Sequence, residues 1–437
     1  MSSSMPDTFL PEAGRPSSVP NYAHIVDLYK RHLSGGRAKI SDVFGTQLEL
    51  SANGAWIETS DGTRFLNAAG YGVMIHGARH PHVEEAVIRQ IRTNPIASRI
   101  LLEPQAALAA EALARVVPKG LAHVHFAGSG TEAVEAAIKL ARTLGKRRLI
   151  SATRGYHGKT LGSLSVTPNP VYQAPFAPLL PDVSTVPFGD ADALEDMLRV
   201  GAEACVILEP VQGEGGVIIP YNSYLREVRA LCDRHGALMV LDEIQTGMGR
   251  LGYWWGADRE GVTPDIMLVG KGLSGGIVPV SAMVATPAAF KAFNKDPFIH
   301  TSTFSAAPIA MAAVRASVEA IEMDGLVQRA ADIGGVLLSR MRGIVARRCP
   351  DLVADVRGLG LLIGVQLKTP GLAGALLAEV VERHLLVNYS FNASEVVRFT
   401  PPAVMNPEEI EFLLSAFDGA CDKLAALYPS MEAVGAN

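Results

Sequence analysis

Short apolar runs alternate with amphipathic segments along the chain from about residue 100. The runs RRLIS, ACVIL, ALMVL and DIMLV are continuous in their apolar character, and each gives way to polar or glycine residues. Between two of them, NSYLREVRALCDRHG (222–236) has helical periodicity and ends in glycine. Continuous apolarity is typical of strands that are covered on both faces. The pattern therefore predicts an α/β fold around a mainly parallel sheet.

The pattern changes after Pro308. Helical periodicity over 309–349 is followed by short strand-like runs in LVADVRGLGLLIGVQL and VVRFTPPAV and by a final helix. Before residue 70, GAWIETSDGTRFLNA predicts a hairpin that turns at Asp61-Gly62. From these changes we expect four segments: an N-terminal arm (1–20), part of a small domain (21–70), a large ligand-binding domain (71–325) and the rest of a small α+β domain (326–437).

The composition is that of a packed globular protein. Of the 437 residues 48% are hydrophobic and 19% are charged, a balance that excludes a disordered chain. The net charge is −5 and no Lys/Arg cluster stands out, so neither nucleic acid nor a membrane is an expected partner. The four cysteines lack CxxC spacing, which argues against a disulfide framework or a metal site. With no secretory pattern at the N-terminus, a cytoplasmic location is expected.

Candidate chemistry gathers at the predicted strand ends, where open parallel sheets bind their ligands. The run HVHF is followed by Gly128-Ser129-Gly130-Thr131, which opens a helix that ends near Gly145. A helix N-terminus offers free N–H groups and partial positive charge, so this turn predicts an anion site, above all for phosphate. A plain capping turn is the alternative, because Ser or Thr ahead of Glu is a common N-cap.

Three further strand ends carry polar groups. Tyr156 follows RRLISATRG, Glu209 and Glu214 lie in the loop EPVQGEGG, and Asp242 ends ALMVLD. The alternatives are a core aromatic residue for Tyr156 and a solvated strand end for Asp242. Two carboxylates among glycines are difficult to explain as core, however, and an aspartate directly after four apolar residues needs a cationic partner. The strand ends therefore indicate a functional site.

Lys271 stands at the end of the next apolar run, DIMLVG, ahead of the glycines in GLSGG. The alternative interpretation is a surface lysine whose stem covers apolar residues. If the two strands are neighbours, however, Lys271 and Asp242 enter one crevice, where partial burial lowers the pKa of an amine and allows it to form a Schiff base. A phosphate site, an aromatic ring, a carboxylate and such a lysine together predict that the cofactor is pyridoxal 5′-phosphate.

The same motifs resemble those of the class III pyridoxal-phosphate-dependent aminotransferases. LDEIQTGMGRLG and PDIMLVGKGLSGG are similar to the family signature. FAGSGTEAVEAAIKLAR, YHGKTLGSLS, LEPVQGEGGV, HTSTFSAAP and VVRFTPP also match, in the family's order, and the similarity covers about residues 45–425. The resemblance implies fold type I, with a mainly parallel, seven-stranded sheet flanked by helices in a large domain and a smaller α+β domain beside it.

Carried over position by position, the resemblance assigns the catalytic roles to Lys271 and Asp242. Lys271 would bind the cofactor and move the proton, and Asp242 would pair with the pyridinium nitrogen. Thr303, in HTSTF, would reach the phosphate across a subunit interface, which implies a homodimer with composite active sites and leaves a higher oligomer open. Tyr156 would stack on the ring and Gln245 would approach its phenolic oxygen. The cofactor-binding residues expected are Ser129, Gly130, Thr131, Tyr156, His157, Glu209, Asp242, Gln245, Lys271 and Thr303; no metal is expected.

The residues expected to bind substrates are Arg398, Glu214, Lys159 and Tyr71. Arg398 resembles the family's arginine that receives an α-carboxylate, and Glu214 resembles the partner that neutralises it when an amine without that carboxylate binds. A structural ion pair is the alternative. The implied reaction is a ping-pong transfer between a terminal primary amine, or the matching aldehyde, and 2-oxoglutarate/glutamate. Racemases, epimerases, aminomutases and dialkylglycine decarboxylases share these motifs and form the alternative class.

Three positions depart from the pattern of the family. Lys159 stands where ornithine-type members carry an arginine for a distal carboxylate, and HGKTLGSLS is more similar to the putrescine and diamine aminotransferases. Ser-Ala-Ala at 305–307 replaces the usual Gly-Gly-Asn, and Ala78 replaces a histidine near Tyr71. The departures favour an amine of specialised metabolism over a role in arginine biosynthesis.

Overall fold

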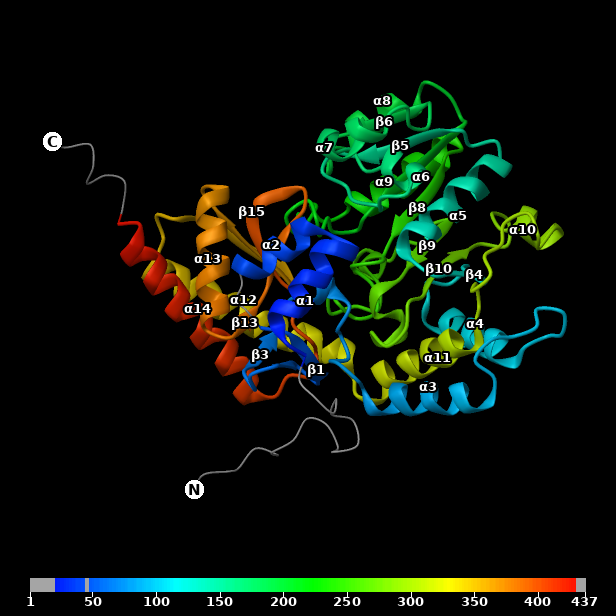
Figure 1. The fold of residues 1–437 in the computed structure, drawn as a ribbon. Coiled ribbons are helices and arrows are strands. Elements are labelled where there is room, and N and C mark those ends of the chain that lie inside the picture. The colour runs from blue at the N-terminus through cyan, green and yellow to red at the C-terminus, as the bar shows by residue number, and fades with distance from the viewer. Residues whose placement is uncertain (1–19, 44–46, 430–437) are drawn as a thin grey trace.

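The computed structural model describes residues 20–43 and 47–429 (Figure 1). Apart from Pro20, the arm predicted over 1–20 lies outside these residues. Their largest sheet has seven strands in the order β4-β10-β9-β8-β7-β5-β6. The strands are β4 (His123–Ala127), β5 (Arg148–Ala152), β6 (Val183–Val186), β7 (Ala204–Leu208), β8 (Leu238–Asp242), β9 (Ile266–Val269) and β10 (Ser281–Ala285). β10 is antiparallel to β4 and β9 and the other neighbouring pairs are parallel, so the predicted fold class is confirmed.

Both faces of this sheet are covered, which explains why its strands are continuously apolar. Along β7, Cys205 and Ile207 face a cluster that contains residues of α5 (Gly130–Thr143). Val206 and Leu208 alternate with them and belong to a second cluster, with residues of α9 (Tyr224–His235) and α4 (Pro104–Val116). The predicted end of the helix over 222–236 is confirmed, because Gly236 caps α9 in the left-handed conformation.

The remaining helices divide into two groups in Figure 1. Around the seven-stranded sheet lie α3 (Pro81–Thr93), α6 (Leu161–Ser165), α7 (Pro170–Gln173), α8 (Ala191–Leu198), α10 (Lys291–Lys295) and α11 (Pro308–Met323). On the other side are α1 (Tyr22–Leu28), α2 (Gly35–Val43), α12 (Leu326–Arg348), α13 (Pro370–Glu382) and α14 (Pro407–Leu427). Within the described residues, no helix is both long and apolar enough to cross a membrane.

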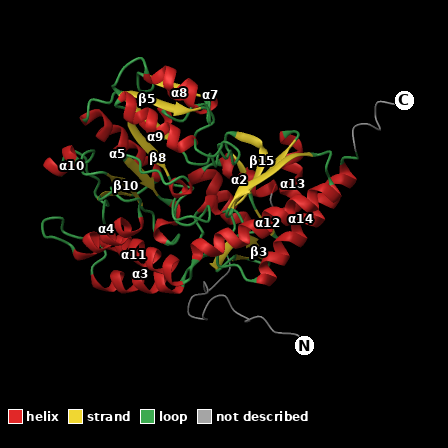
Figure 2. Ribbon diagram, turned by 180° about the vertical axis from the view of Figure 1, so that it is seen from behind, coloured by secondary structure: helices red, strands yellow, loops and turns green. Residues whose placement is uncertain are grey.

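Two smaller sheets complete the fold. β11 (Val353–Leu359), β12 (Leu362–Leu367), β15 (Ala393–Phe399) and β14 (Asn388–Ser390) form an antiparallel sheet, and α12, α13 and α14 lie alongside it (Figure 2). The other sheet contains β1 (Glu49–Asn53), β2 (Trp56–Thr59), β3 (Arg64–Asn67) and β13 (Leu385–Leu386). β2 and β3 are joined at Asp61-Gly62, which confirms the predicted hairpin. β13 pairs with β3, so the N-terminal strands share a sheet with the C-terminal part of the chain.

The helical pattern predicted over 309–349 is two helices in the structure. α11 ends at Met323 and α12 begins at Leu326, because Gly325 adopts a left-handed φ of 59° between them. The chain turns at this glycine and passes from the helices below the large sheet to those beside the C-terminal sheet (Figure 1).

Candidate active site

The polar residues that follow the predicted strands lie along one edge of the large sheet. β4, β5, β7, β8 and β9 all point the same way, so their carboxyl ends meet at this edge. β8 pairs with β9, with Asp242 opposite Leu268, three residues ahead of Lys271. The strand that Asp242 ends and the strand that Lys271 follows are therefore neighbours, which is the condition that the sequence set for placing the two side chains together.

Lys271 opens the short turn that follows β9. It is half-buried and has a left-handed φ of 46°, a conformation that is strained for a non-glycine residue and that gathers at functional sites. Burial, as the main cause, lowers the pKa of Lys271 to about 8; the positive charge of Arg398 adds to this, whereas nearby carboxylates, chiefly that of Glu214, oppose it. A larger share of Lys271 is consequently the neutral, nucleophilic amine than for an ordinary lysine.

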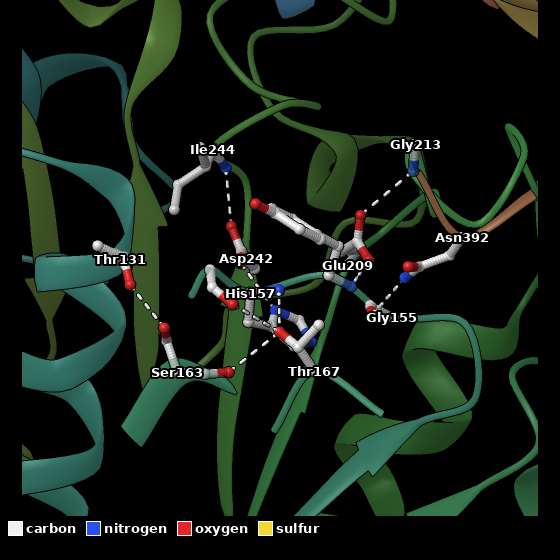
Figure 3. A network of polar contacts seen from close by, with 12 residues as sticks. Thr131, Gly155, His157, Ser163, Thr167, Glu209, Gly213, Asp242, Ile244 and Asn392 are labelled. Carbon is white, nitrogen blue, oxygen red and sulfur yellow. Dashed lines mark hydrogen bonds and ion pairs between the residues drawn. The ribbon is translucent and has the colours of Figure 1, made fainter. Parts of the chain in front are cut away.

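Asp242 is held by two donors at the end of β8. Its Oδ2 atom lies 2.8 Å from Nδ1 of His157, and its Oδ1 accepts from the backbone N–H of Ile244 at 3.1 Å (Figure 3). His157 is in turn fixed through its own N–H, which donates to Oγ1 of Thr167 at 2.9 Å. The same hydroxyl donates to the carbonyl of Ser163. Asp242 therefore has a fixed orientation at the end of β8, beside the strand that Lys271 follows.

Glu209 acts on the backbone around the site. Its two carboxylate oxygens accept from the N–H groups of Tyr156 (3.0 Å) and Gly213 (3.2 Å) (Figure 3). Burial raises the pKa of Glu209 to about 7. Tyr156 itself is half-buried, and burial, helped by the charge of Glu214, raises its pKa to about 12. Glu209 thus joins the loop after β5 to the loop after β7 and positions Tyr156 between them.

The predicted anion site is the N-terminus of α5. Ser129 is its N-cap residue, and the helix begins at Gly130 and Thr131. Oε2 of Glu132 accepts from the N–H of Gly128 and from the Ser129 hydroxyl. The Thr131 hydroxyl lies 2.5 Å from that of Ser163 (Figure 3). The first N–H groups of a helix have no acceptor within it, so those at Gly130 and Thr131 are available to an anion at the positive end of the helix dipole.

Arg398 and Glu214 form a buried ion pair, as the sequence indicated. Arg398 Nη1 lies 2.7 Å from Glu214 Oε1, and the two side chains are 0% and 4% exposed. The pair does not meet hydrogen-bond geometry, so all three guanidinium nitrogens are buried without a hydrogen-bond partner among the described residues. Buried donors of this kind are costly unless a ligand satisfies them. The guanidinium is therefore suited to receive a carboxylate.

Tyr71 and Lys159 meet at a phenylalanine that the sequence did not single out. The Phe391 ring stacks on that of Tyr71 (centroids 5.8 Å apart) and lies 6.0 Å from that of Tyr156. Lys159 Nζ lies 5.2 Å from the centre of the Phe391 ring and 3.9 Å from that of Tyr172. The exposed Lys159 ammonium is thus held over aromatic rings beside the site.

Thr303 is not brought to the other predicted site residues. Its side chain is exposed and its carbonyl accepts from Arg99 at 3.1 Å. Within the part of the chain that the structure describes, no hydrogen bond joins its hydroxyl to the rest of the site.

The sequence did not single out three residues that contact the site: Phe391, Asn392 and Arg250. Arg250 is buried and donates to the carbonyls of Gly72, Leu361 and Pro401, and such contacts between distant segments leave no local sequence signal.

Comparison with known proteins places this fold among the fold type I enzymes that depend on pyridoxal 5′-phosphate. A model of the family "Aminotransferase class-III" matches residues 46–421, so the chain belongs to the class III aminotransferases. A putrescine aminotransferase of Pectobacterium atrosepticum is 39% identical over 411 residues, which are 92% of this chain and 86% of that one. As the sequence predicted, the protein is a pyridoxal-phosphate-dependent ω-aminotransferase.

Solved structures agree with this assignment. The ornithine aminotransferase from Toxoplasma gondii ME49 is 26% identical, with a TM-score of 0.87, over 93% of this chain and 96% of that one. An ω-transaminase from Pseudomonas jessenii in complex with PMP is also 26% identical, with a TM-score of 0.82, over 89% of this chain and 95% of that one.

The residues at the site fit the cofactor. Nε2 of Gln245 is buried without a hydrogen-bond partner among the described residues, so it is free to donate to an oxygen on the ring. The loop after β7 packs closely behind this amide, because a Cβ on Gly213 would come within 2.0 Å of Gln245 Oε1. A nucleophilic amine, a fixed carboxylate, a free amide donor and a helix N-terminus together match an aldehyde, a pyridine nitrogen, a phenolic oxygen and a phosphate.

Proposed function

We propose that this aminotransferase moves an amino group between a terminal primary amine, or the matching aldehyde, and 2-oxoglutarate/glutamate by a ping-pong mechanism. The buried ion pair of Arg398 and Glu214 beside Lys271 carries the proposal. Glu214 neutralises Arg398 while an amine without an α-carboxylate is bound. A keto acid brings a carboxylate that replaces Glu214 on the guanidinium. One site can thereby accept two unlike substrates in turn.

Lys271 is the proposed proton carrier. Pyridoxal 5′-phosphate, when bound, supplies the electron sink that stabilises negative charge on the substrate carbon next to nitrogen. Lys271 Nζ would take the proton from that carbon and return it on the other side of the nitrogen. The pKa of about 8 keeps the amine able both to accept and to donate a proton near neutral pH.

The other residues hold the cofactor. Asp242, supported by His157, keeps a proton on the ring nitrogen, and Gln245 donates to the phenolic oxygen. Tyr156, whose backbone Glu209 fixes, covers the ring face. The N-terminus of α5, with Ser129, Gly130 and Thr131, would hold the phosphate, and Thr303 would reach it from a second subunit.

The surface around Thr303 supports a homodimer with composite sites. Large apolar side chains stand out from two adjacent loops: Ile96, Ile100, Leu101, Leu102, Phe298, Ile299 and Phe304. Arg99 joins the loops by donating to the carbonyls of Ser302 and Thr303. Exposed apolar surface of this extent marks a protein interface. Sedimentation velocity should show a dimer for the protein and a monomer for Leu101→Asp/Leu102→Asp; a dimer in both would contradict this interface.

We further propose that the amine substrate is a short diamine and that the protein is cytoplasmic. The putrescine aminotransferase that the chain resembles makes short diamines the first substrates to test. The four cysteines are free and buried, as suits a reducing cytoplasm. The purified protein should be given a panel of amines with 2-oxoglutarate, and glutamate should be measured. Glutamate formed with terminal amines supports the function; racemisation, rearrangement or decarboxylation without glutamate would assign the chain to the alternative class.

A further inference from the structure

The turn that precedes the strand of Arg398 reaches across to the opposite side of the site. It joins β14 to β15 and carries Phe391 and Asn392. In Figure 3 the Asn392 side chain lies against Gly155 and near the loop that holds Gly213. Residues far apart in the sequence, after β5, after β7 and before β15, therefore meet at this turn.

Asn392 uses its amide fully in this position. Its Nδ2 donates to the carbonyls of Arg154 and Gly155, both at 3.0 Å, and its Oδ1 accepts from Asn169 at 2.8 Å. Its backbone N–H donates to the carbonyl of Glu214 at 2.9 Å. Two donors and an acceptor on one short planar group suit an asparagine, whereas an aspartate would direct a carboxylate at two carbonyl oxygens. Asn392 thus fixes the turn to the loops around it.

Phe391 gives the Glu214 carboxylate a hydrogen bond in addition to its ion pair with Arg398. Its backbone N–H donates to Glu214 Oε2 at 3.0 Å, while the other oxygen, Oε1, faces Arg398. The Phe391 ring is packed against Tyr71 and Tyr156, and its carbonyl accepts from the Tyr172 hydroxyl at 3.2 Å. The side chain and the backbone of Phe391 are therefore both fixed by neighbouring residues, and its N–H remains directed at Glu214.

This contact matters when a substrate carboxylate takes Arg398. Glu214 is buried, with 3% of the residue exposed, and a buried carboxylate with no donor is very unfavourable. The N–H of Phe391 belongs to the backbone and is not taken by the substrate, so Glu214 keeps a charge-stabilising hydrogen bond after it leaves the guanidinium. Without that donor, Glu214 would remain on Arg398 and exclude the keto acid.

We propose that the Phe391 N–H is the resting place of Glu214 in the keto-acid half-reaction, and that Asn392 is the positioning residue that holds it there. The inference rests on the proposed function, in which Glu214 and Arg398 distinguish the two substrates. It makes Asn392 a determinant of carboxylate binding although Asn392 touches neither Arg398 nor the reacting atoms.

The test measures the equilibrium binding of glutarate to the holoenzyme. Glutarate is a dicarboxylate that cannot accept an amino group. Asn392→Ala should weaken glutarate binding in calorimetry, and raise the KM for 2-oxoglutarate, by about tenfold. The amine half-reaction should change less than about threefold, because Glu214 stays on Arg398 while the amine reacts. Asn392→Asp keeps the shape and should weaken glutarate binding at least as much. Ser394→Ala, which alters an exposed side chain two residues on, should leave glutarate binding unchanged.

Glu214→Ala separates this inference from the proposed function. On its own it should tighten glutarate binding, since Arg398 is then permanently available; if it does not, the proposed function fails. In the Glu214→Ala background, Asn392→Ala should have no further effect, because its action passes through Glu214. An equal loss of glutarate affinity in both backgrounds, or none in the wild-type background, would overturn the role of Asn392. Should Asn392→Ala not fold, Asn392→Asp in the same two backgrounds decides the question.

Discussion

The carboxylate of Asp242 lies 2.8 Å from the imidazole of His157, and both side chains are almost completely buried. Burial alone would lower the pKa of His157, but the hydrogen bond to Asp242 and the charges of Asp242 and Glu209 together raise it above its ordinary value of 6.5. The raised pKa favours a charged imidazolium beside Asp242, and such a pair suits a carboxylate that holds a proton on a pyridine nitrogen.

The raised pKa of His157 predicts how the stability of the cofactor-free protein depends on pH. A histidine whose pKa is higher in the folded state stabilises that state fully below its unfolded value, and the contribution is lost as pH rises through the folded pKa. The difference in unfolding free energy between the wild type and His157→Gln should therefore be largest below pH 6.5 and shrink above it. Urea unfolding at a series of pH values measures it, and a difference that grows with pH would contradict the ion pair.

Replacement of Asp242 should affect catalysis more than folding. Asp242→Ala removes the group that keeps the ring nitrogen protonated, and kcat should fall about a hundredfold or more. In Asp242→Asn, which keeps the shape of the side chain but not its charge, kcat should fall by a similar factor. Steady-state kinetics with thermal unfolding as a check on folding gives the answer. Turnover within a few-fold of wild type in a folded Asp242→Ala variant would remove Asp242 from the site.

Lys271 should determine both the colour of the protein and the pH dependence of its loading. Lys271→Ala should fold but lack the visible absorption band of the lysine-bound cofactor, whereas Lys291→Ala, which alters an exposed lysine on α10, should keep it. The wild-type rate of cofactor uptake should rise with pH through about 8, because the neutral amine is the reactive form. Stopped-flow absorbance measures the rate of cofactor uptake. A visible band that persists in Lys271→Ala would contradict the assignment of Lys271 as the lysine that binds the cofactor.

Arg398 should discriminate between the two substrates. Arg398→Ala leaves Glu214 buried without its cation and the keto acid without a receptor, so the KM for 2-oxoglutarate should rise about a hundredfold. Arg398→Lys keeps the charge but not the planar fork and should give an intermediate value. The KM for an amine without an α-carboxylate serves as the internal comparison. Equal changes in both KM values would indicate a purely structural ion pair.

Lys159 should influence which amines are preferred. Its ammonium, held over the rings of Tyr172 and Phe391, repels a second positive charge at the far end of a diamine. Because Lys159 is exposed, the effect is modest, and Lys159→Ala should lower the KM for putrescine by about two- to fivefold. A monoamine of equal length should not change. An unchanged KM for putrescine would mean that Lys159 does not face the substrate, and a rise for putrescine alone would contradict the proposed repulsion.

The sequence predicts the elements of the site better than the connections between them. Lys271 and Asp242 could be placed together because each directly follows an apolar run, and parallel strands end at a common edge. The turn at Phe391-Asn392 could not be placed at the site from the sequence. Its partners Gly155 and Glu214 lie about two hundred residues away, and only tertiary packing joins them to it. The break at Gly325 was also missed, because apolar periodicity continues on both sides of that glycine.

The most direct test of the account is a half-reaction without keto acid. The holoenzyme is mixed with a single terminal amine, and the visible band is followed while the product and the cofactor are analysed. If the protein transfers amino groups as proposed, the band disappears and one equivalent of aldehyde forms with pyridoxamine phosphate. Addition of 2-oxoglutarate then restores the band and yields one equivalent of glutamate. If several amines react and pyridoxamine phosphate never accumulates, the protein does not transfer amino groups and the account is wrong.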